Sequence, residues 1–256
     1  MIQFEARNGF ARLVLDRAAE ANALDLALAQ DALAALREAE RDPSVRVLAI
    51  TGAGDVFCGG GDVKAMAAAE DPSAFLAELA DAVHEFVLGL ATSRLFVVAG
   101  VNGPAAGGGL GLALNADYVI ASDRAWFLAA YADIGLTPDS GVSSLLPRVV
   151  GHQRAMELLL TGRRLSASEA AQWGLANEVV AHDALDARMS ALCASVATRL
   201  PHVLASTKRL VSPEHIETYR AHLAEESATI ARMAAHPDSM ALITRFANRS
   251  SGASPA

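Results

Sequence analysis

The sequence predicts an α/β fold built on a largely parallel sheet. Short apolar runs alternate with amphipathic helical patterns, which is typical of parallel strands joined by crossover helices. Two of these runs end in glycine-rich turns, where such sheets place their sites. The hydrophobic fraction of 52% over 256 residues suits one large globular domain, alone or with an appendage.

The first half of the chain is expected to alternate between the two kinds of element. Apolar runs predict strands at 10–16, 45–51, 96–101, 117–121 and 125–127. Helical spacing of apolar residues predicts helices over 25–41 and 73–90. Asp25 is a plausible cap for the first helix, and Pro43 follows its end.

The second half is expected to be mostly helical. A turn at 137–141 leads into a helix, another helix covers 154–160, and Ser166 with Glu169 is typical of the cap of a short helix. From about residue 183 the pattern is helical to the end, with breaks at Pro201, Pro213 and Pro237. We expect an appended helical layer that packs on the core or on a neighbouring subunit, and disorder over 250–256.

The organising stretch of the sequence is the turn after the third strand, which contains Gly107, Gly108 and Gly109. Three successive glycines cost backbone entropy, which suggests either tight helix–sheet packing or N–H groups left free for a negative charge. That charge would be a phosphate or a reaction oxyanion. The stretch fits no dinucleotide-binding pattern, and the chain contains no P-loop. A second glycine turn at 59–61 favours the oxyanion, because each turn can supply one N–H to the same oxygen.

Composition excludes several classes of function. A net charge of −8 argues against nucleic-acid and anionic membrane partners, and no apolar run is long enough to span a membrane. Residues 1–5 do not resemble a signal peptide. Cys58 and Cys193 give neither a disulfide framework nor a metal-ligand spacing. A cytoplasmic protein with no metal is therefore expected.

Taken together, the motifs resemble the enoyl-CoA hydratase/isomerase (crotonase) superfamily over nearly the whole length of the chain. The matching pieces, highly specific in this order, are Asn22-Ala23-Leu24, 50–52, 57–64, 101–111, 114–117, 134–139, 146–148, 170–175 and 244–246. The resemblance implies a spiral of ββα units at 1–198, which binds acyl-CoA, and a C-terminal helical region at 199–256, which forms oligomer contacts and covers the pocket. It also implies a homotrimer or a homohexamer.

The resemblance also implies the site residues. The backbone N–H groups of Gly61 and Gly108 would hold the thioester oxygen, in agreement with the pairing of glycine turns above. Coenzyme A, which enters as part of the substrate and not as a cofactor, would lie along Ala21, Ala23, Gly59, Gly60, Asp62, Val63 and Lys64. Lys64 and Arg17 are candidates for the CoA phosphates, whereas Asp62 is expected to cap the following helix.

The chain departs from the hydratases in this superfamily at both catalytic glutamates, where it has Gly111 and Tyr131. A carboxylate remains at Asp139. By itself Asp139 is typical of a helix cap after Pro138, but the resemblance implies a proton shuttle, as in the isomerases, or a nucleophile, as in the aryl-CoA dehalogenases. His84 matches a water-activating histidine of that second branch, although a lone helical histidine is more often structural. Tyr131 is expected to be a pocket wall.

The sequence therefore predicts an acyl-CoA enzyme, with a Δ3–Δ2 double-bond isomerase as the preferred activity and Asp139 as its single acid/base. The alternative is an aryl-CoA dehalogenase or hydrolase in which Asp139 attacks and His84 activates water. An alternative of another class is a non-catalytic CoA-binding scaffold.

Overall fold

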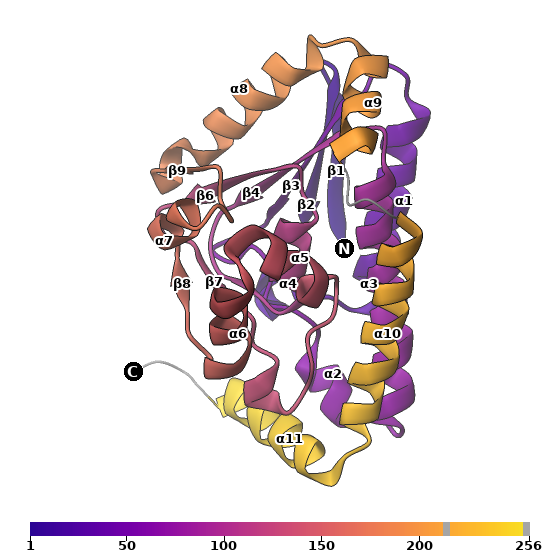
Figure 1. Ribbon diagram of the computed structural model, residues 1–256, viewed down its shortest axis with the longest axis vertical. Coiled ribbons are helices and arrows are strands. Elements are labelled where there is room, and N and C mark those ends of the chain that lie inside the picture. The colour runs from indigo at the N-terminus through magenta and orange to yellow at the C-terminus, as the bar shows by residue number, and fades with distance from the viewer. Residues whose placement is uncertain (212–215, 253–256) are drawn as a thin grey trace.

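The computed structural model describes residues 1–211 and 216–252, and two sheets lie at its centre (Figure 1). The larger sheet has the order β1-β2-β3-β4-β6-β9 and the smaller one the order β5-β7-β8. Only β1 and β2 pair antiparallel in the larger sheet, so the predicted largely parallel sheet is confirmed. The strands are β1 (Ile2–Arg7), β2 (Phe10–Leu15), β3 (Val47–Gly52), β4 (Phe96–Val101), β5 (Ala105–Ala106), β6 (Tyr118–Ser122), β7 (Trp126–Leu128), β8 (Leu165–Ser166) and β9 (Glu178–Val180).

Helices cover the sheets and form the C-terminal part of the described chain. The α-helices are α1 (Leu26–Arg41), α2 (Val63–Ala68), α3 (Pro72–Thr92), α4 (Gly108–Leu114), α5 (Val142–Val150), α6 (His152–Thr161), α7 (Ala167–Gln172), α8 (Leu185–Ala197), α9 (Pro201–Val211), α10 (Ile216–Ala234) and α11 (Pro237–Gly252). Short 3₁₀ helices are η1 (Ala18–Glu20), η2 (Ala132–Ile134) and η3 (His182–Ala184). No helix in these two ranges is long and apolar enough to cross a membrane.

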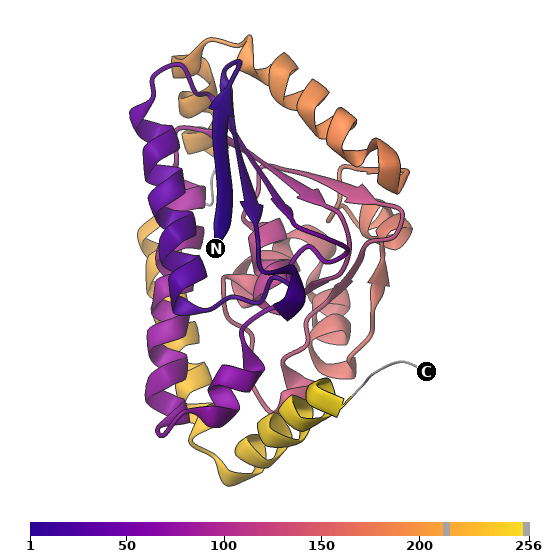
Figure 2. The same cartoon turned by 180° about the vertical axis from the view of Figure 1, so that it is seen from behind.

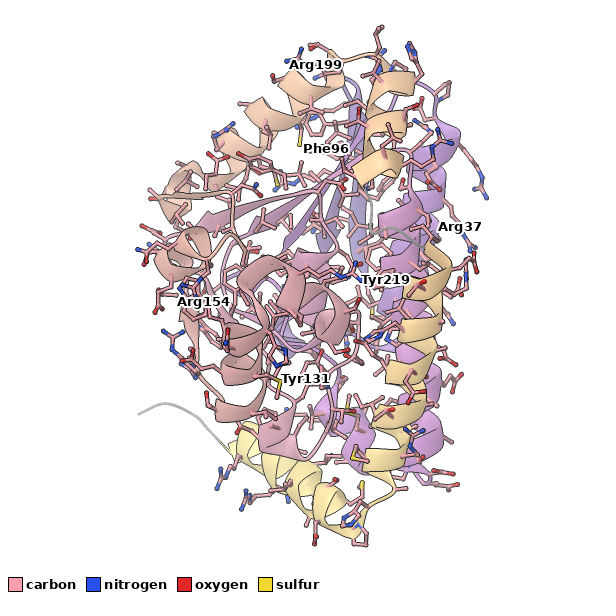
Figure 3. The ribbon with its side chains drawn as sticks, viewed as in Figure 1. Arg37, Phe96, Tyr131, Arg154, Arg199 and Tyr219 are labelled. Carbon is pink, nitrogen blue, oxygen red and sulfur yellow. The ribbon has the colours of Figure 1, made fainter. Side chains whose placement is uncertain are left out.

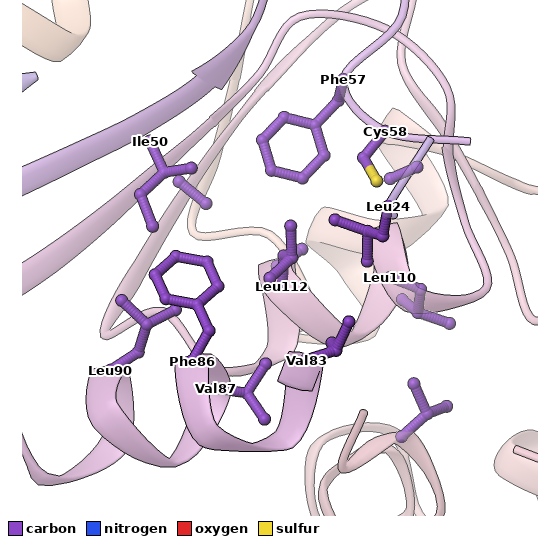
Figure 4. Close-up of a cluster of buried hydrophobic side chains, with 14 of the residues drawn as sticks. Leu24, Ile50, Phe57, Cys58, Val83, Phe86, Val87, Leu90, Leu110 and Leu112 are labelled. Atoms are coloured by element: carbon purple, nitrogen blue, oxygen red, sulfur yellow. The ribbon is translucent and has the colours of Figure 1, made fainter. Parts of the chain in front are cut away.

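The central strands of the larger sheet are buried on both faces, because they alternate apolar residues between two cores. Val47 and Ala49 of β3 face one way, with Val98 of β4, and pack against α8. The residues between them face the main core with α1 and α3. Figure 2 shows α8 on one side of the sheet and the α1–α3 pair on the other. Within the main core, Phe86 of α3 points toward the region of Ile50 of β3 and Leu112 of α4 (Figure 4).

Most of the expected elements are present, with small shifts at their ends. Asp25 caps α1 by accepting a hydrogen bond from Leu28 N–H, and Ser166 forms a capping box with Glu169 before α7. The helix after the glycine turn begins within the glycine stretch itself, at Gly108. Strands β1, β5, β8 and β9 were not predicted; β5 and β8 have only two residues each. β1 alternates charged residues along an exposed edge, and β9 has only three residues.

The C-terminal helices run back across the molecule. α10 lies along α3, and α11 packs against α2 and η2 at the end nearest the glycine turns (Figure 1). Helices begin at Pro201 and Pro237, as the sequence predicts, while Pro213 lies outside the described residues. The expected division at 198/199 falls in the turn between α8 and α9. α11 continues to Gly252, so disorder does not begin at 250; residues 253–256 lie outside the described part.

Candidate active site

The two glycine turns lie against each other at the carboxyl ends of β3 and β4. Ala106 N–H donates to the carbonyl of Cys58 at 2.9 Å, which holds the turns side by side. A Cβ added to Gly60 would lie 3.5 Å from the Gly108 nitrogen, so the two backbones are in contact. A Cβ on Gly109 would lie 2.2 Å from the Cys58 carbonyl oxygen. These glycines therefore allow a backbone approach that no other residue permits.

Two backbone N–H groups at this junction are unpaired. Neither Gly61 nor Gly108 donates a hydrogen bond to any residue in 1–211 and 216–252. Gly108 opens α4, and the first N–H groups of a helix have no acceptor within it. The Gly60 carbonyl and the Gly61 N–H belong to the same peptide group. The carbonyl accepts a hydrogen bond from Leu24 N–H at 2.7 Å, which holds the peptide group in place. The arrangement leaves two neighbouring donors available to a negatively charged oxygen.

Asp139 presents a carboxylate with one oxygen held and one oxygen free. Its Oδ1 accepts hydrogen bonds from the Tyr131 hydroxyl at 2.7 Å and from the Ser140 hydroxyl at 3.0 Å. Its Oδ2 accepts none from the described residues. Asp139 is half-buried, and it does not cap α5, whose N-cap is Gly141. The helix-cap alternative for its side chain is therefore wrong.

Tyr131 links Asp139 to the glycine turn. A Cβ on Gly107 would lie 3.9 Å from the Tyr131 ring carbon that carries the hydroxyl, and the side chain is buried (Figure 3). Burial, followed by the nearby charge of Asp139, raises the pKa of the Tyr131 phenol well above its ordinary value. Tyr131 is thus a neutral hydrogen-bond donor at physiological pH, and it forms a wall between the two parts of the site.

Gly111 has no space for a side chain. A Cβ at this position would lie 2.5 Å from the Ser140 Cβ and 2.8 Å from the Ser140 carbonyl oxygen. The turn that carries Asp139 therefore occupies the volume in which a glutamate at 111 would begin. A glutamate at position 111 and this turn in its present place therefore exclude each other sterically.

His84 lies on α3, buried, beside the same turn. Its Nε2 accepts a hydrogen bond from Ser140 N–H at 3.0 Å, and its Nδ1 is buried with no partner among the described residues. Burial lowers the pKa of His84, and the charges of Asp139 and Asp81 only partly oppose this. The ring is therefore neutral at pH 7 with its proton on Nδ1, because a backbone N–H can only donate. In this arrangement neither ring nitrogen is free to accept a proton from water.

Glu226 of α10 is a member of this cluster that the sequence analysis missed. It is 5% exposed, and it accepts hydrogen bonds from Gly141 N–H at 2.8 Å and Ser143 N–H at 3.1 Å. Its Oε2 lies 3.8 Å from His84 Nε2. The helical spacing of apolar residues could have identified Glu226 as a buried acid, because Leu223 and Ile230 are buried on the same face of α10.

The residues expected along coenzyme A lie in and beside the glycine turn at 59–61. The Ala21 carbonyl accepts from Gly59 N–H at 2.9 Å, and Ala21 has a left-handed backbone with φ 53°. Asp62 caps α2 through Ala65 N–H, as predicted, and Val63 begins that helix. Lys64 is exposed on α2.

Arg17 is less available for a phosphate than Lys64. Its guanidinium pairs with Asp25 at 3.1 Å and with Asp62 at 3.4 Å, and it donates to the Ala23 carbonyl at 2.7 Å. Only 13% of its side chain is exposed. The structure therefore gives Arg17 a bracing role between the first segment and the glycine turn. No cluster of three potential metal ligands occurs within 1–211 and 216–252.

The paired glycine turns thus place two backbone N–H groups, unpaired among the described residues, close to the Asp139 turn at one end of the parallel sheet. The family model for enoyl-CoA hydratase/isomerase matches residues 5–251, and the chain belongs to this family. Its fold is the crotonase fold. The structure superposes on an enoyl-CoA hydratase from Bacillus halodurans with a TM-score of 0.89 at 27% identity, over 95% of this chain and 99% of that one.

Relatives of known name carry out different reactions on CoA thioesters. The chain is 34% identical to a 4-chlorobenzoyl coenzyme A dehalogenase from an Arthrobacter species, over 92% of this chain and 86% of the relative. It is 36% identical to the 1,2-epoxyphenylacetyl-CoA isomerase of Escherichia coli, over 82% of this chain and 81% of the relative. The family is therefore fixed, whereas its members differ in the reaction that follows thioester binding.

Proposed function

We propose that this protein is an acyl-CoA isomerase that moves a double bond from C3 to C2 of an enoyl thioester. The observation that carries the proposal is the single carboxylate of Asp139. It has one oxygen held by two hydroxyl donors and one oxygen free, beside two unpaired backbone N–H groups. Both hydratase glutamate positions are occupied by other structure, Gly111 packed on Ser140 and Tyr131 bonded to Asp139.

In the proposed mechanism, Asp139 removes a proton from C2 of the 3-enoyl thioester. The electron pair moves into a dienolate, whose negative oxygen is stabilised by the N–H groups of Gly61 and Gly108. Each such donor is worth ~3 kcal/mol of barrier when it is fixed beforehand. The protonated Asp139 then returns the proton to C4, which gives the 2-enoyl thioester. One acid/base suffices because no water enters the reaction.

A second candidate is an aryl-CoA dehalogenase, favoured by the 34% identity to the Arthrobacter dehalogenase over 92% of this chain. Asp139 would attack the ring carbon, halide would leave, and water would hydrolyse the aryl ester. That last step requires a base, and His84 is the candidate. The hydrogen bond from Ser140 N–H to His84 Nε2 is the observation against this role, because it occupies the lone pair that a base needs.

The experiment is product analysis by mass spectrometry after incubation with 3-enoyl-, 2-enoyl- and 4-halobenzoyl-CoA thioesters. We expect 3-enoyl-CoA to give 2-enoyl-CoA, and Asp139→Asn to lower the rate by ~10²–10⁴-fold. His84→Ala should keep most of the isomerase activity. A halide product, with an aryl adduct accumulating on residue 139 in His84→Ala, would establish the dehalogenase instead. If no thioester is converted but CoA thioesters bind, the CoA-binding scaffold remains.

A further inference from the structure

Glu226 is a charged residue on a helix face that buries mainly apolar residues. Tyr219, Leu223 and Ile230 are buried on the same face of α10, which packs along α3 and touches α5. Removing a carboxylate from water is unfavourable unless hydrogen bonds replace its hydration. The hydrogen bonds of Glu226 must therefore compensate for its lost hydration. Their donors show which part of the structure Glu226 stabilises.

The hydrogen bonds that Glu226 accepts all come from the start of α5. Oε2 accepts from Gly141 N–H, and Oε1 accepts from the N–H and the hydroxyl of Ser143. Gly141 is the N-cap of α5, which has no side-chain cap of its own. A helix begins with N–H groups that lack acceptors, and a carboxylate is the group that stabilises them best. Glu226 thus caps α5 from a different helix.

The capped turn is the one that carries Asp139. Ser140 has a left-handed backbone with φ 57°, which is unfavourable for a residue with a side chain, and Gly141 follows with φ 80°. Such a turn keeps its shape only if neighbouring structure fixes it. Ser140 N–H is fixed by His84, and the next N–H, of Gly141, is fixed by Glu226.

We propose that Glu226 is a positioning residue for Asp139. Its carboxylate anchors the turn so that Asp139 Oδ1 stays on the Tyr131 hydroxyl and Oδ2 stays free for the substrate. This inference rests on the acid/base role proposed above for Asp139. Loss of the anchor lets the turn relax away from its left-handed conformation, and a displacement of about 1 Å at a catalytic group costs on the order of 10²-fold in rate.

The charge state of Glu226 gives the anchor a pH dependence. Burial raises the pKa of Glu226 to about 7, against the lowering effect of the Ser143 hydroxyl and Gly141 N–H. The ionised carboxylate accepts from every donor around it, whereas the protonated form loses one acceptor site. The rate should therefore fall as the pH drops through about 7. The titratable or charged groups around Glu226 are His84 and Asp81 on α3, Arg148 on α5, Tyr219 and His222 on α10, and Tyr131 and Asp139.

The test is Glu226→Gln, with Glu225→Gln as the matched control. Glu225 is the exposed neighbour on the same helix, paired with Arg232. We expect Glu226→Gln to lower kcat by ~10–100-fold with KM almost unchanged, and to lose the decline of kcat near pH 7. Glu226→Asp should recover part of kcat, and Glu225→Gln should match the wild type. Wild-type kcat in a folded Glu226→Gln variant would overturn the proposal.

A double variant separates this proposal from the proposed function. Glu226→Gln added to Asp139→Asn should cause no further loss, because Glu226 acts through Asp139. A further loss of the same size would mean that Glu226 acts independently, and would overturn the inference while leaving Asp139 as the acid/base. Full activity of Asp139→Asn alone would overturn both. If Glu226→Gln does not fold, Ser143→Ala provides the test, with an expected ~3-fold loss in kcat through one missing donor; an unchanged kcat would overturn the inference.

Discussion

Gly111 has a steric role at the scale of single residues, because Ser140 of the Asp139 turn fills the space beside it. A Cβ at 111 would lie 2.5 Å from the Ser140 Cβ, far inside van der Waals contact. Overpacking of this kind typically costs ~1–3 kcal/mol, which exceeds the gain in helix propensity from replacing glycine with alanine. A glutamate cannot be placed at position 111 without moving the turn that carries Asp139.

We therefore predict that Gly111→Ala lowers the free energy of unfolding by ~2 kcal/mol in urea denaturation. Ser140→Gly removes the opposing Cβ and relieves the left-handed backbone of Ser140, so it should recover about 1 kcal/mol of that loss in the double variant. Gly89→Ala in α3 is the matched control, since its new Cβ would meet the flexible end of Leu36 at 2.9 Å. Additive effects of Gly111→Ala and Ser140→Gly would contradict this explanation.

The Tyr131 hydroxyl donates to Asp139, at 2.7 Å to Oδ1 and at 3.3 Å to the backbone carbonyl oxygen. Tyr131→Phe removes the donor to Asp139 Oδ1 and keeps the ring that forms the wall. A hydrogen bond to a charged group is worth ~1.5–3 kcal/mol, so we expect kcat to fall by ~10–100-fold while the melting temperature changes little. Tyr118→Phe, in β6 on the α8 side of the sheet, is the control. An unchanged kcat in Tyr131→Phe would mean that Asp139 does not need this donor.

α9 is an unusual helix at the scale of secondary structure, because the side chain that it buries is a lysine. Lys208 Nζ donates to the carbonyls of Leu90 and Leu95 at 2.8 and 3.0 Å, and pairs with Asp117 at 2.7 Å. Leu90 lies in the last turn of α3, where the carbonyl groups receive no hydrogen bond from an N–H of the same helix. Burial lowers the pKa of Lys208, and the charge of Asp117 partly restores it. One ammonium group thus joins α9 to the end of α3 and the start of β4.

Lys208→Met should therefore destabilise the protein by about 3 kcal/mol, because it takes the donor from the Leu90 and Leu95 carbonyls and the cation from Asp117, which keeps only the hydrogen bond from Val97 N–H. The matched control is Arg209→Met, which changes the exposed neighbour and should alter stability by less than about 0.5 kcal/mol. Chemical denaturation followed by circular dichroism measures both. Equal stability of Lys208→Met and the wild type would indicate that α9 is held by other contacts.

The surface of α9 bears on the assembly of the whole molecule. With Lys208 facing inward, its apolar residues and Leu200 just before it face outward; Leu200, Val203, Leu210 and Val211 are 60%, 47%, 80% and 77% exposed. Exposed apolar residues gathered on one helix are typical of an interface. This surface agrees with the trimer or hexamer that the family resemblance implies, in which a second copy would cover it.

We predict that light scattering at micromolar concentration gives three or six times the monomer mass of 26.6 kDa. Val203→Glu combined with Leu210→Glu places charge on the exposed face of α9 and should shift the protein toward the monomer, without loss of secondary structure. A wild-type monomer would contradict the oligomer. A double variant that keeps the wild-type mass would place the interface on another surface.

The sequence by itself determined the family, the parallel sheet and the glycine turns. The two glycine turns were predicted from apolar runs that end in glycine-rich stretches, which is a local pattern, and the family resemblance assigned the oxyanion role to Gly61 and Gly108 within them. Strand β4 and helix α1 were found because their apolar residues follow the period of one element. Asp139 was singled out by its place in a family motif.

Only the tertiary structure decided how the groups around Asp139 meet. Tyr131, Ser140, His84 and Glu226 come from the segment before α5, from α3 and from α10, and no local pattern specifies which of their atoms form hydrogen bonds. Glu226 was missed because its role depends on the N-terminus of another helix, 83–85 positions away in sequence. Hydrogen-bond partners and burial follow from packing between elements, and the period of a single element does not contain them.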